Sequence, residues 1–273
     1  MKNNDILRVF LGGDVFGVSG LRCVAALLPG FLSREEIDFC AMNGENATLG
    51  IGLSGDDAKA LFAAGVDVIT GGNHSFEKRD FWPVLDELPS VLRPANFPRL
   101  EGQFALPGRG SIVVEKAGAR IAVLNLQGRE DMTAIDCPFR AADAALEAWG
   151  SEDRAPIVLV DFHAESNQEK EALGLYLDGR VAAVVGTHTH VQTADERILS
   201  KGTAYMTDLG MTGPTRSVIG GDPAISIRRN VSQVLYRLEE AGGPSALRGL
   251  IVEISATTGR ALSVRRVDIP EGN

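Results

Sequence analysis

The chain contains four histidines, and each of them follows an apolar run typical of a buried strand. His74 ends the segment GGNH, His163 lies in DFHAE, and His188 and His190 form an H-x-H pair in GTHTH. Neutral imidazole is the commonest metal ligand in proteins. We therefore expect the histidines to meet at a metal site.

Carboxylate and amide side chains follow strand-like runs in the same way. Asp14 lies in GDVFG, Glu45 and Asn46 lie in NGEN, and Asn73 precedes the histidine of GGNH. Their oxygens are hard ligands, and a carboxylate such as that of Glu45 can bridge two cations. A mixed nitrogen and oxygen donor set suits manganese, iron or zinc better than an ion that prefers thiolates. None of the three cysteines lies within these segments.

The H-x-H pair sets a geometric condition. Successive side chains of an extended strand alternate between its two faces, but residues two apart lie on the same side only while the chain stays regular. If His188 and His190 leave the strand in a turn, both can still face one site. A single histidine or asparagine is more often structural, so the prediction depends on the whole set converging.

Apolar, β-branched runs predict the strands that must position these residues. They lie at residues 6–11, 39–42, 66–69, 121–126, 157–160, 181–185 and 204–206. Helix-like segments stand between several of them, at residues 54–64, 79–88, 141–149 and 168–177. Ligands of open α/β sheets bind at the carboxyl ends of the strands, so five segments that are distant in sequence can converge there.

Two hairpins interrupt this α/β alternation. One joins residues 111–114 to 120–126, and the other joins 250–254 to 262–267 around 257–259. A mixed sheet, or two packed sheets flanked by helices, accommodates both patterns. Residues 94–110 and 212–223 are expected to be long loops, and residues around 228–242 are expected to be rich in helix. We expect a single domain over residues 1–273.

Charge and composition limit the partners. Subtracting 27 basic from 36 acidic residues leaves a net charge of −9, which argues against binding to long DNA or RNA. The apolar runs are too short to cross a bilayer, and residues 1–10 do not resemble a signal peptide. The expected protein is cytoplasmic and does not bind membranes, and any phosphate that it binds needs a cation.

Competing motifs are absent. The glycines of residues 12–20 follow a strand but are not spaced as G-x-G-x-x-G, and no Walker A lysine follows them. A serine hydrolase would need a nucleophile elbow such as G-x-S-x-G, which Gly17-Val18-Ser19-Gly20 does not provide. No organic cofactor is expected.

The ordered motifs resemble the YmdB-like family of calcineurin-type metallophosphoesterases over nearly the whole chain. These motifs are GDVFG (13–17), NGEN (43–46), GGNH (71–74), DFHAE (161–165), GTHTH (186–190) and TDLGMTGP (207–214). Calcineurin-like enzymes at large begin with D-x-H and end with G-H-x-H, and this chain departs from both patterns in the manner of the YmdB-like branch. The segment around residues 228–242 is the part least similar to the family.

The resemblance implies a four-layer sandwich of two mixed β-sheets flanked by helices. It also implies 2′,3′-cyclic-nucleotide 2′-phosphodiesterase activity, with a small phosphoester or cyclic nucleotide as the substrate. It implies two divalent or mixed-valence metal ions, iron or manganese with zinc as the alternative. Glu45 would lie between them, and His74 would protonate the leaving oxygen after a bridging hydroxide attacks phosphorus. The first metal would be held by Asp14, Glu45, Asn46 and His190, and the second by Glu45, Asn73, His163 and His188.

Other functions remain open at this point. The same ligands would serve a phosphomonoesterase or a phosphoprotein phosphatase, in which different loops shape the site. A regulatory protein that binds nucleotides and turns them over slowly is a second class, and a structural α/β domain is a third. The resemblance also makes a homo-oligomer plausible.

Overall fold

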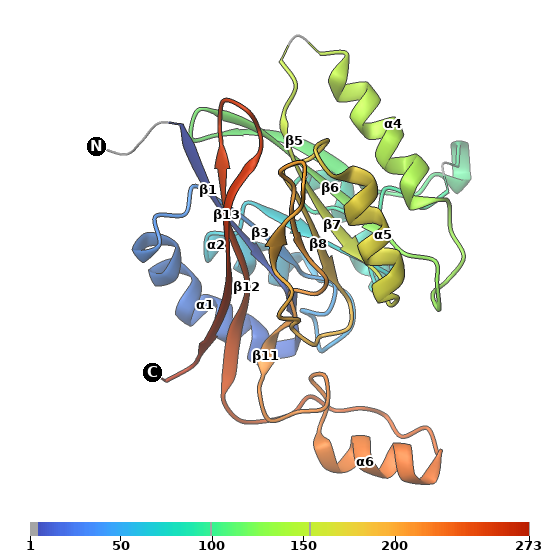
Figure 1. Cartoon of the computed structure of the whole chain (residues 1–273). Helices are drawn as coiled ribbons and strands as arrows, with labels where there is room; N and C mark the ends of the chain where they lie inside the picture. The colour runs from blue at the N-terminus through green and yellow to red at the C-terminus, as the bar shows by residue number, and fades with distance from the viewer. Residues whose placement is uncertain (1–4, 99, 153, 273) are drawn as a thin grey trace.

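Two β-sheets pack face to face and carry helices on their outer faces in this computed structural model, which describes residues 5–98, 100–152 and 154–272 (Figure 1). One apolar cluster lies between the sheets and combines residues of both, such as Val9 and Val123. Two further clusters join each sheet to its helices. The four-layer α/β sandwich expected from the resemblance is therefore confirmed.

The first sheet has seven strands in the order β2-β11-β12-β1-β3-β4, with β13 paired to β12. β1, β3 and β4 are parallel, whereas β12 is antiparallel to β1, β11 and β13. Its strands are β1 (Ile6–Gly12), β2 (Asp14–Val15), β3 (Phe39–Asn43), β4 (Val68–Thr70), β11 (Met211–Pro214), β12 (Ser245–Ser255) and β13 (Ala261–Pro270).

The second sheet has six strands in the order β5-β6-β7-β8-β10-β9. Its four central strands are parallel, and an antiparallel strand closes each edge. The strands are β5 (Ser111–Lys116), β6 (Ala119–Gln127), β7 (Ile157–His163), β8 (Ala183–Thr187), β9 (Arg197–Ile198) and β10 (Ala204–Met206). The carboxyl ends of the parallel strands of both sheets are available to form a common site.

Helices cover the outer faces, and serine caps start two of them. Ser54 accepts a hydrogen bond from the Asp57 amide at the start of α2, and Ser166 accepts one from the Glu169 amide at the start of α5. The helices are α1 (Gly17–Arg34), α2 (Gly55–Ala63), α3 (Trp82–Glu87), α4 (Pro138–Gly150), α5 (Asn167–Leu177) and α6 (Pro223–Ser232), with short 3₁₀ turns at Arg79–Phe81 and Gly102–Phe104.

The predicted strands, the four predicted helices and both hairpins are present, with ends shifted by a few residues. α1 was not predicted from the sequence, because Gly17, Gly20 and Pro29 weaken its helical pattern. A Cβ on Gly20 would lie 2.5 Å from the Thr212 carbonyl, so this glycine lets the helix pack closely on β11. The helix is therefore favoured by tertiary packing more than by local propensity.

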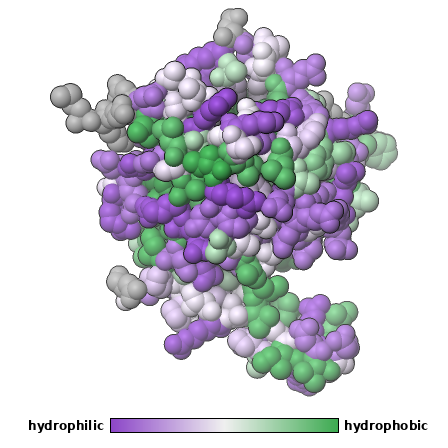
Figure 2. All heavy atoms as spheres, in the orientation of Figure 1, coloured by the Kyte–Doolittle hydropathy of each residue, from purple (hydrophilic) through white to green (hydrophobic). Residues whose placement is uncertain are grey.

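Residues 215–244 form an excursion that we call the arm. It leaves β11 and returns to β12, whose ends pair side by side, and it carries α6 away from the layered body (Figure 1), as a lobe that projects from the main body (Figure 2). The expectation of a loop over residues 212–223 is wrong for its first residues, which belong to β11. The expected helix-rich segment around 228–242 is wrong after Ser232, where α6 ends.

Within the described residues, none of the helices combines the length and the apolar character that crossing a membrane requires.

Candidate metal centre

The predicted site residues converge at one edge of the sandwich, although they span most of the chain. Each lies where a strand begins or ends: Asp14 opens β2, His163 ends β7, and the others follow β3, β4 and β8. The group is completed by Glu45, Asn46, Asn73, His74, His188 and His190. The expected convergence is therefore present in the structure.

His163 lies at the centre of a first group of donors. Its Nε2 atom is 2.8 Å from Glu45 Oε1, 3.1 Å from Asn73 Oδ1 and 3.0 Å from His188 Nδ1. His163 is fully buried and Glu45 is nearly so. Glu45, His163 and His188 place one ligand atom each within 4.8 Å of one another, which is close enough to hold a metal ion.

A hydrogen-bond chain behind His163 decides which ring nitrogen faces this group. The Thr187 hydroxyl donates to Asp161 Oδ1 at 2.8 Å, so it has only a lone pair left for His163 Nδ1, 2.9 Å away. Asp161 also accepts hydrogen bonds from Thr70 and Asn43. In the neutral, metal-binding form of His163 the proton is therefore on Nδ1, and the Nε2 lone pair points toward Glu45.

The arrangement fits a metal ion. A lone pair that faces two oxygens and a second imidazole nitrogen needs a cation between them. Among the described residues, the buried oxygens Asp14 Oδ1 and Glu45 Oε1 have no hydrogen-bond partner, and the close contact of Glu45 with His163 does not have hydrogen-bond geometry. A Cβ on Gly72 would lie 2.4 Å from His163 Nε2, so a glycine is required beside the group.

The pKa values of these side chains also indicate that the group favours a positive charge. Burial lowers the pKa of His163, but the carboxylates of Glu45, Asp14 and Asp161 together outweigh burial and raise that pKa to about 9. Burial raises the pKa of Glu45, yet His163 and His74 together bring it down to about 2. Burial, together with the charge on His163, lowers the pKa of His188 to about 3. One positive charge is therefore strongly favoured among these three side chains, where a cation would replace the proton.

Asp14, Asn46 and His190 form a second group beside the first. Asp14 Oδ1 lies 3.8 Å from His190 Nε2, and the Asn46 amide nitrogen lies 3.1 Å from the same ring atom. Burial raises the pKa of Asp14 to about 6, against the opposing effect of His190. His190 Nδ1 donates a hydrogen bond to the Ile219 carbonyl at 2.9 Å, so its Nε2 atom is the one that faces Asp14 and Asn46. The structure therefore brings together the residues that the resemblance assigns to the two ligand sets.

The chain turns at the H-x-H pair. β8 ends at Thr187, and both His188 (φ 103°) and His190 (φ 65°) adopt left-handed backbone conformations. Asp208 holds this turn, because its Oδ2 accepts hydrogen bonds from the Thr189 amide and hydroxyl. Strain of this kind persists only where the surroundings determine it, and here it brings both imidazoles to one site.

His74 lies beside the centre without facing its donors. Its backbone amide donates to Glu45 Oε2 at 3.0 Å, and its Nδ1 atom lies 3.3 Å from Glu77 Oε1. Glu77 therefore orients the ring so that Nε2 is left for a ligand. The His74 side chain lines a cavity together with Glu45, His188 and His190.

Several supporting residues were missed by the sequence analysis. Thr187 and Asp161 hold His163, and Glu165 Oε2 lies 3.1 Å from His188 Nε2 and so directs the Nδ1 atom of that ring inward. Lys170 and Asp208 form a buried ion pair at 2.7 Å behind the histidine turn. All of them except Lys170 lie within the recognised motifs, but their spacing alone does not indicate which side chain supports which ligand.

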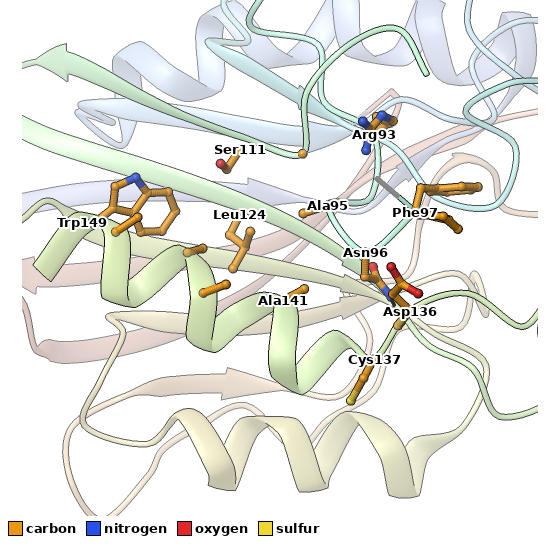
Figure 3. Close-up of a pocket in the computed structure, with 15 residues that line it drawn as sticks. Arg93, Ala95, Asn96, Phe97, Ser111, Leu124, Asp136, Cys137, Ala141 and Trp149 are labelled. Atoms are coloured by element: carbon orange, nitrogen blue, oxygen red, sulfur yellow. Dashed lines mark hydrogen bonds between the residues drawn. The ribbon is translucent and has the colours of Figure 1, made fainter. Parts of the chain in front are cut away.

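A larger cavity of about 580 Å³ lies elsewhere, between α4 and the second sheet (Figure 3). Trp149 stands at one end and Phe97 at the other, and the alanine side of α4 forms one wall. None of the predicted site residues lines it. Size therefore does not identify the centre of chemistry in this molecule.

Known proteins are similar to this chain in sequence and in fold. The family described as YmdB-like protein matches residues 10–267. A 2′,3′-cyclic-nucleotide 2′-phosphodiesterase of Bacillus subtilis is 42% identical over 261 residues, which cover 96% of each chain.

Solved structures agree. A crystal structure described as a novel phosphatase from Mycoplasma pneumoniae superposes with a TM-score of 0.90 at 33% identity, over 97% of this chain and 94% of that one. The NAD nucleotidase of Haemophilus influenzae, at 14% identity and a TM-score of 0.62, covers 96% of this chain and 50% of its own. The latter likeness shows the fold alone.

Proposed function

The chain belongs to the YmdB-like protein family and is an enzyme of the phosphoesterase type, and on that premise we propose that it hydrolyses 2′,3′-cyclic nucleotides to 3′-nucleotides. The proposed cofactors are two metal ions, iron or manganese, with zinc as the alternative. The relative from Bacillus subtilis carries this activity in its name. A small cyclic ester also agrees with the net charge of −9, which disfavours long nucleic acids.

One observation supports the metal requirement most strongly. The His163 Nε2 lone pair faces Glu45 and Asn73 oxygens and a nitrogen of His188, and a glycine keeps the space beside it open. Glu45, Asn73, His163 and His188 would hold one ion. Asp14, Asn46 and His190 would hold the other, with Glu45 between the two. The donors are nitrogen and oxygen atoms, as iron, manganese and zinc require.

When bound, the two ions would supply an activated water and neutralise the phosphoryl oxygens. The remaining steps belong to the protein. Gly72 leaves room for the His163 and Glu45 side chains, and the turn at His188 to His190 brings both imidazoles to the site. In its cationic form His74, whose Nδ1 faces Glu77, would give its Nε2 proton to the departing 2′ oxygen of the ribose.

A phosphomonoesterase is the second candidate, because the Mycoplasma pneumoniae structure is described as a phosphatase. The same donors would serve it, and only the shape of the surrounding cavity would differ. A nucleotide-binding regulatory role with slow turnover is compatible with the same centre.

A substrate panel coupled to elemental analysis tests the proposal. Freshly purified protein is analysed for iron, manganese and zinc and assayed with 2′,3′-cAMP, 3′,5′-cAMP and 3′-AMP. We expect about two metal ions per chain and preferred hydrolysis of 2′,3′-cAMP to 3′-AMP. Preferred hydrolysis of 3′-AMP would favour the phosphatase, and absence of hydrolysis with tight nucleotide binding would favour the regulatory role.

A single domain over residues 1–273, a homo-oligomeric state and a cytoplasmic location are predictions from the sequence and stay proposals. Sedimentation of the purified chain tests the oligomeric state.

A further inference from the structure

A cavity of about 500 Å³ opens directly beside the candidate metal centre. One side is lined by centre residues, including Glu45, His74 and His190, and the other side is apolar. The apolar side consists of Phe16, Leu49, Ile51, Val218, Ile219 and Leu238. The volume is within the range of small-molecule sites, about 300–1,000 Å³.

Five of these apolar side chains are exposed to solvent. Leu49 is 71% exposed, Ile219 56%, Leu238 47%, Val218 41% and Ile51 39%. An isolated exposed leucine is ordinary, but five around one cavity form an apolar surface that a ligand would remove from water. Charged residues of both signs, Lys78, Arg237, Glu239 and Glu240, line the same cavity. A ligand with an apolar face and polar edges fits this lining.

Backbone strain is concentrated at the same place. Eight described residues other than glycine have left-handed φ angles, and four of them line this cavity: Leu49 (56°), His188 (103°), His190 (65°) and Ile219 (47°). A branched residue such as Ile219 adopts this conformation very rarely. Strained residues of this kind gather where function determines the geometry.

The arm fixes the apolar wall relative to the metal centre. The Ile219 carbonyl accepts the hydrogen bond of His190 Nδ1, so the same residue orients a proposed ligand and lines the cavity. At the base of the arm, Glu240 accepts hydrogen bonds from the amides of Val18 and Ser19 at the start of α1. The Ala241 amide donates to the Gly220 carbonyl and ties the two sides of the arm together.

We propose that this cavity is the subsite for the nucleobase of the substrate, and that Leu49, Ile219 and Leu238 contact the faces of the planar ring. The inference rests on the proposed function, since the phosphate would lie at the metal centre. It adds that this cavity selects the organic part of the ester, which is an aromatic heterocycle joined to ribose.

The larger cavity beside α4 lacks these features. It is lined by none of the metal-centre residues, and none of the left-handed residues other than glycine lies on it. A ligand there would have no described link to the reacting phosphate. The nucleobase subsite is therefore placed in the smaller cavity beside the metal centre.

Selectivity between two esters tests the subsite. The kcat/KM of the metal-loaded enzyme is measured for 2′,3′-cAMP and for the 2′,3′-cyclic phosphate of 1-O-methylribose, which lacks a base. We expect Leu49→Ala and Leu238→Ala each to lower the ratio of the two values about tenfold, the scale for losing a small apolar contact. Val231→Ala is the matched control, because Val231 is 81% exposed on α6 and does not line the cavity.

The possible failures are distinguishable. Hydrolysis of both esters with an unchanged ratio in both leucine variants would overturn the subsite and leave the phosphodiesterase intact. Hydrolysis of neither ester by the wild type would overturn the proposed function. Binding of adenosine, followed by NMR saturation transfer on the metal-free chain, still tests the cavity in that case. We expect binding to wild type and to Val231→Ala, with a clear loss in Leu49→Ala, and equal binding to all three would overturn the subsite.

Discussion

Two regions of this molecule meet at the candidate site, a buried floor around His163 and an exposed rim that carries Leu49 and Ile219. In the floor, His163 and Asp161 are almost fully enclosed, and each is held by several side chains. In the rim, Leu49 and Ile219 are more than half exposed, and each belongs to a connection from a strand to a helix. Side chains that would meet metal ions are fixed before any ligand arrives, whereas side chains that would meet the organic group face solvent.

The difference follows from what each region must do. A metal centre needs its donors at set positions, and a low-dielectric surrounding strengthens every charge within it. Recognition of an apolar group needs apolar surface that water still covers in the free enzyme, because removing that water supplies the binding energy. Changes in the floor should therefore be costly and changes in the rim selective.

The largest effect is expected for Glu45→Gln. Removing the bridging charge from the floor should lower the metal content and reduce kcat/KM by about 10²–10³-fold or more, the scale for losing one preorganised charged group. Elemental analysis and steady-state kinetics on the same sample check this. Wild-type metal content together with wild-type activity would contradict the role of Glu45.

Lys170→Met should follow in size. The Lys170–Asp208 pair is about 1% exposed and lies at 2.7 Å, so the change leaves a buried carboxylate unpaired. We expect a loss of about 3–5 kcal/mol in the free energy of unfolding, measured with urea.

Lys116→Met is the matched control, because the Lys116–Asp67 pair is similarly close but partly exposed. Its loss should stay within about 1 kcal/mol. Equal losses in the two variants would remove the distinction between a buried support and a surface ion pair.

His74→Ala should retain both metal ions and slow the hydrolysis of 2′,3′-cAMP by about 10²-fold, because the departing ribose oxygen then lacks a proton donor. A p-nitrophenyl ester, whose leaving group needs little protonation, should lose much less activity. An equal loss with both substrates, or a loss of metal, would argue against the general-acid role.

The smallest effect is expected at the end of the arm. Leu235 is 81% exposed and lies outside the cavity, so Leu235→Ser should change stability by no more than about 0.5 kcal/mol and leave turnover as it is. Thermal unfolding and kcat/KM for 2′,3′-cAMP are the measurements. A marked loss in either would mean that the arm beyond its base contributes to the floor, and the contrast between the two regions would fail.

Local patterns in the sequence predicted much of the fold. The strand runs, the Ser54 cap and both hairpins have short-range signals, since apolar periodicity and turn residues act within a few positions. α1 has a weak local signal, because Gly17, Gly20 and Pro29 lower helix propensity and its packing on β11 compensates. The arm was misassigned after Ser232 for a related reason, since its course depends on contacts such as that of Glu240 with α1.

The sequence alone shows which residue types are available for chemistry and that they follow strands, so their convergence was predictable from the direction of the strands. How these side chains face one another depends on the folded structure. The left-handed turn at His188 and His190, the proton on His163 Nδ1 and the apolar wall at Ile219 depend on partners distant in sequence: Asp208, Thr187 with Asp161, and the base of the arm. Side-chain orientation and protonation are set by the surrounding field and packing, which exist only once the chain has folded.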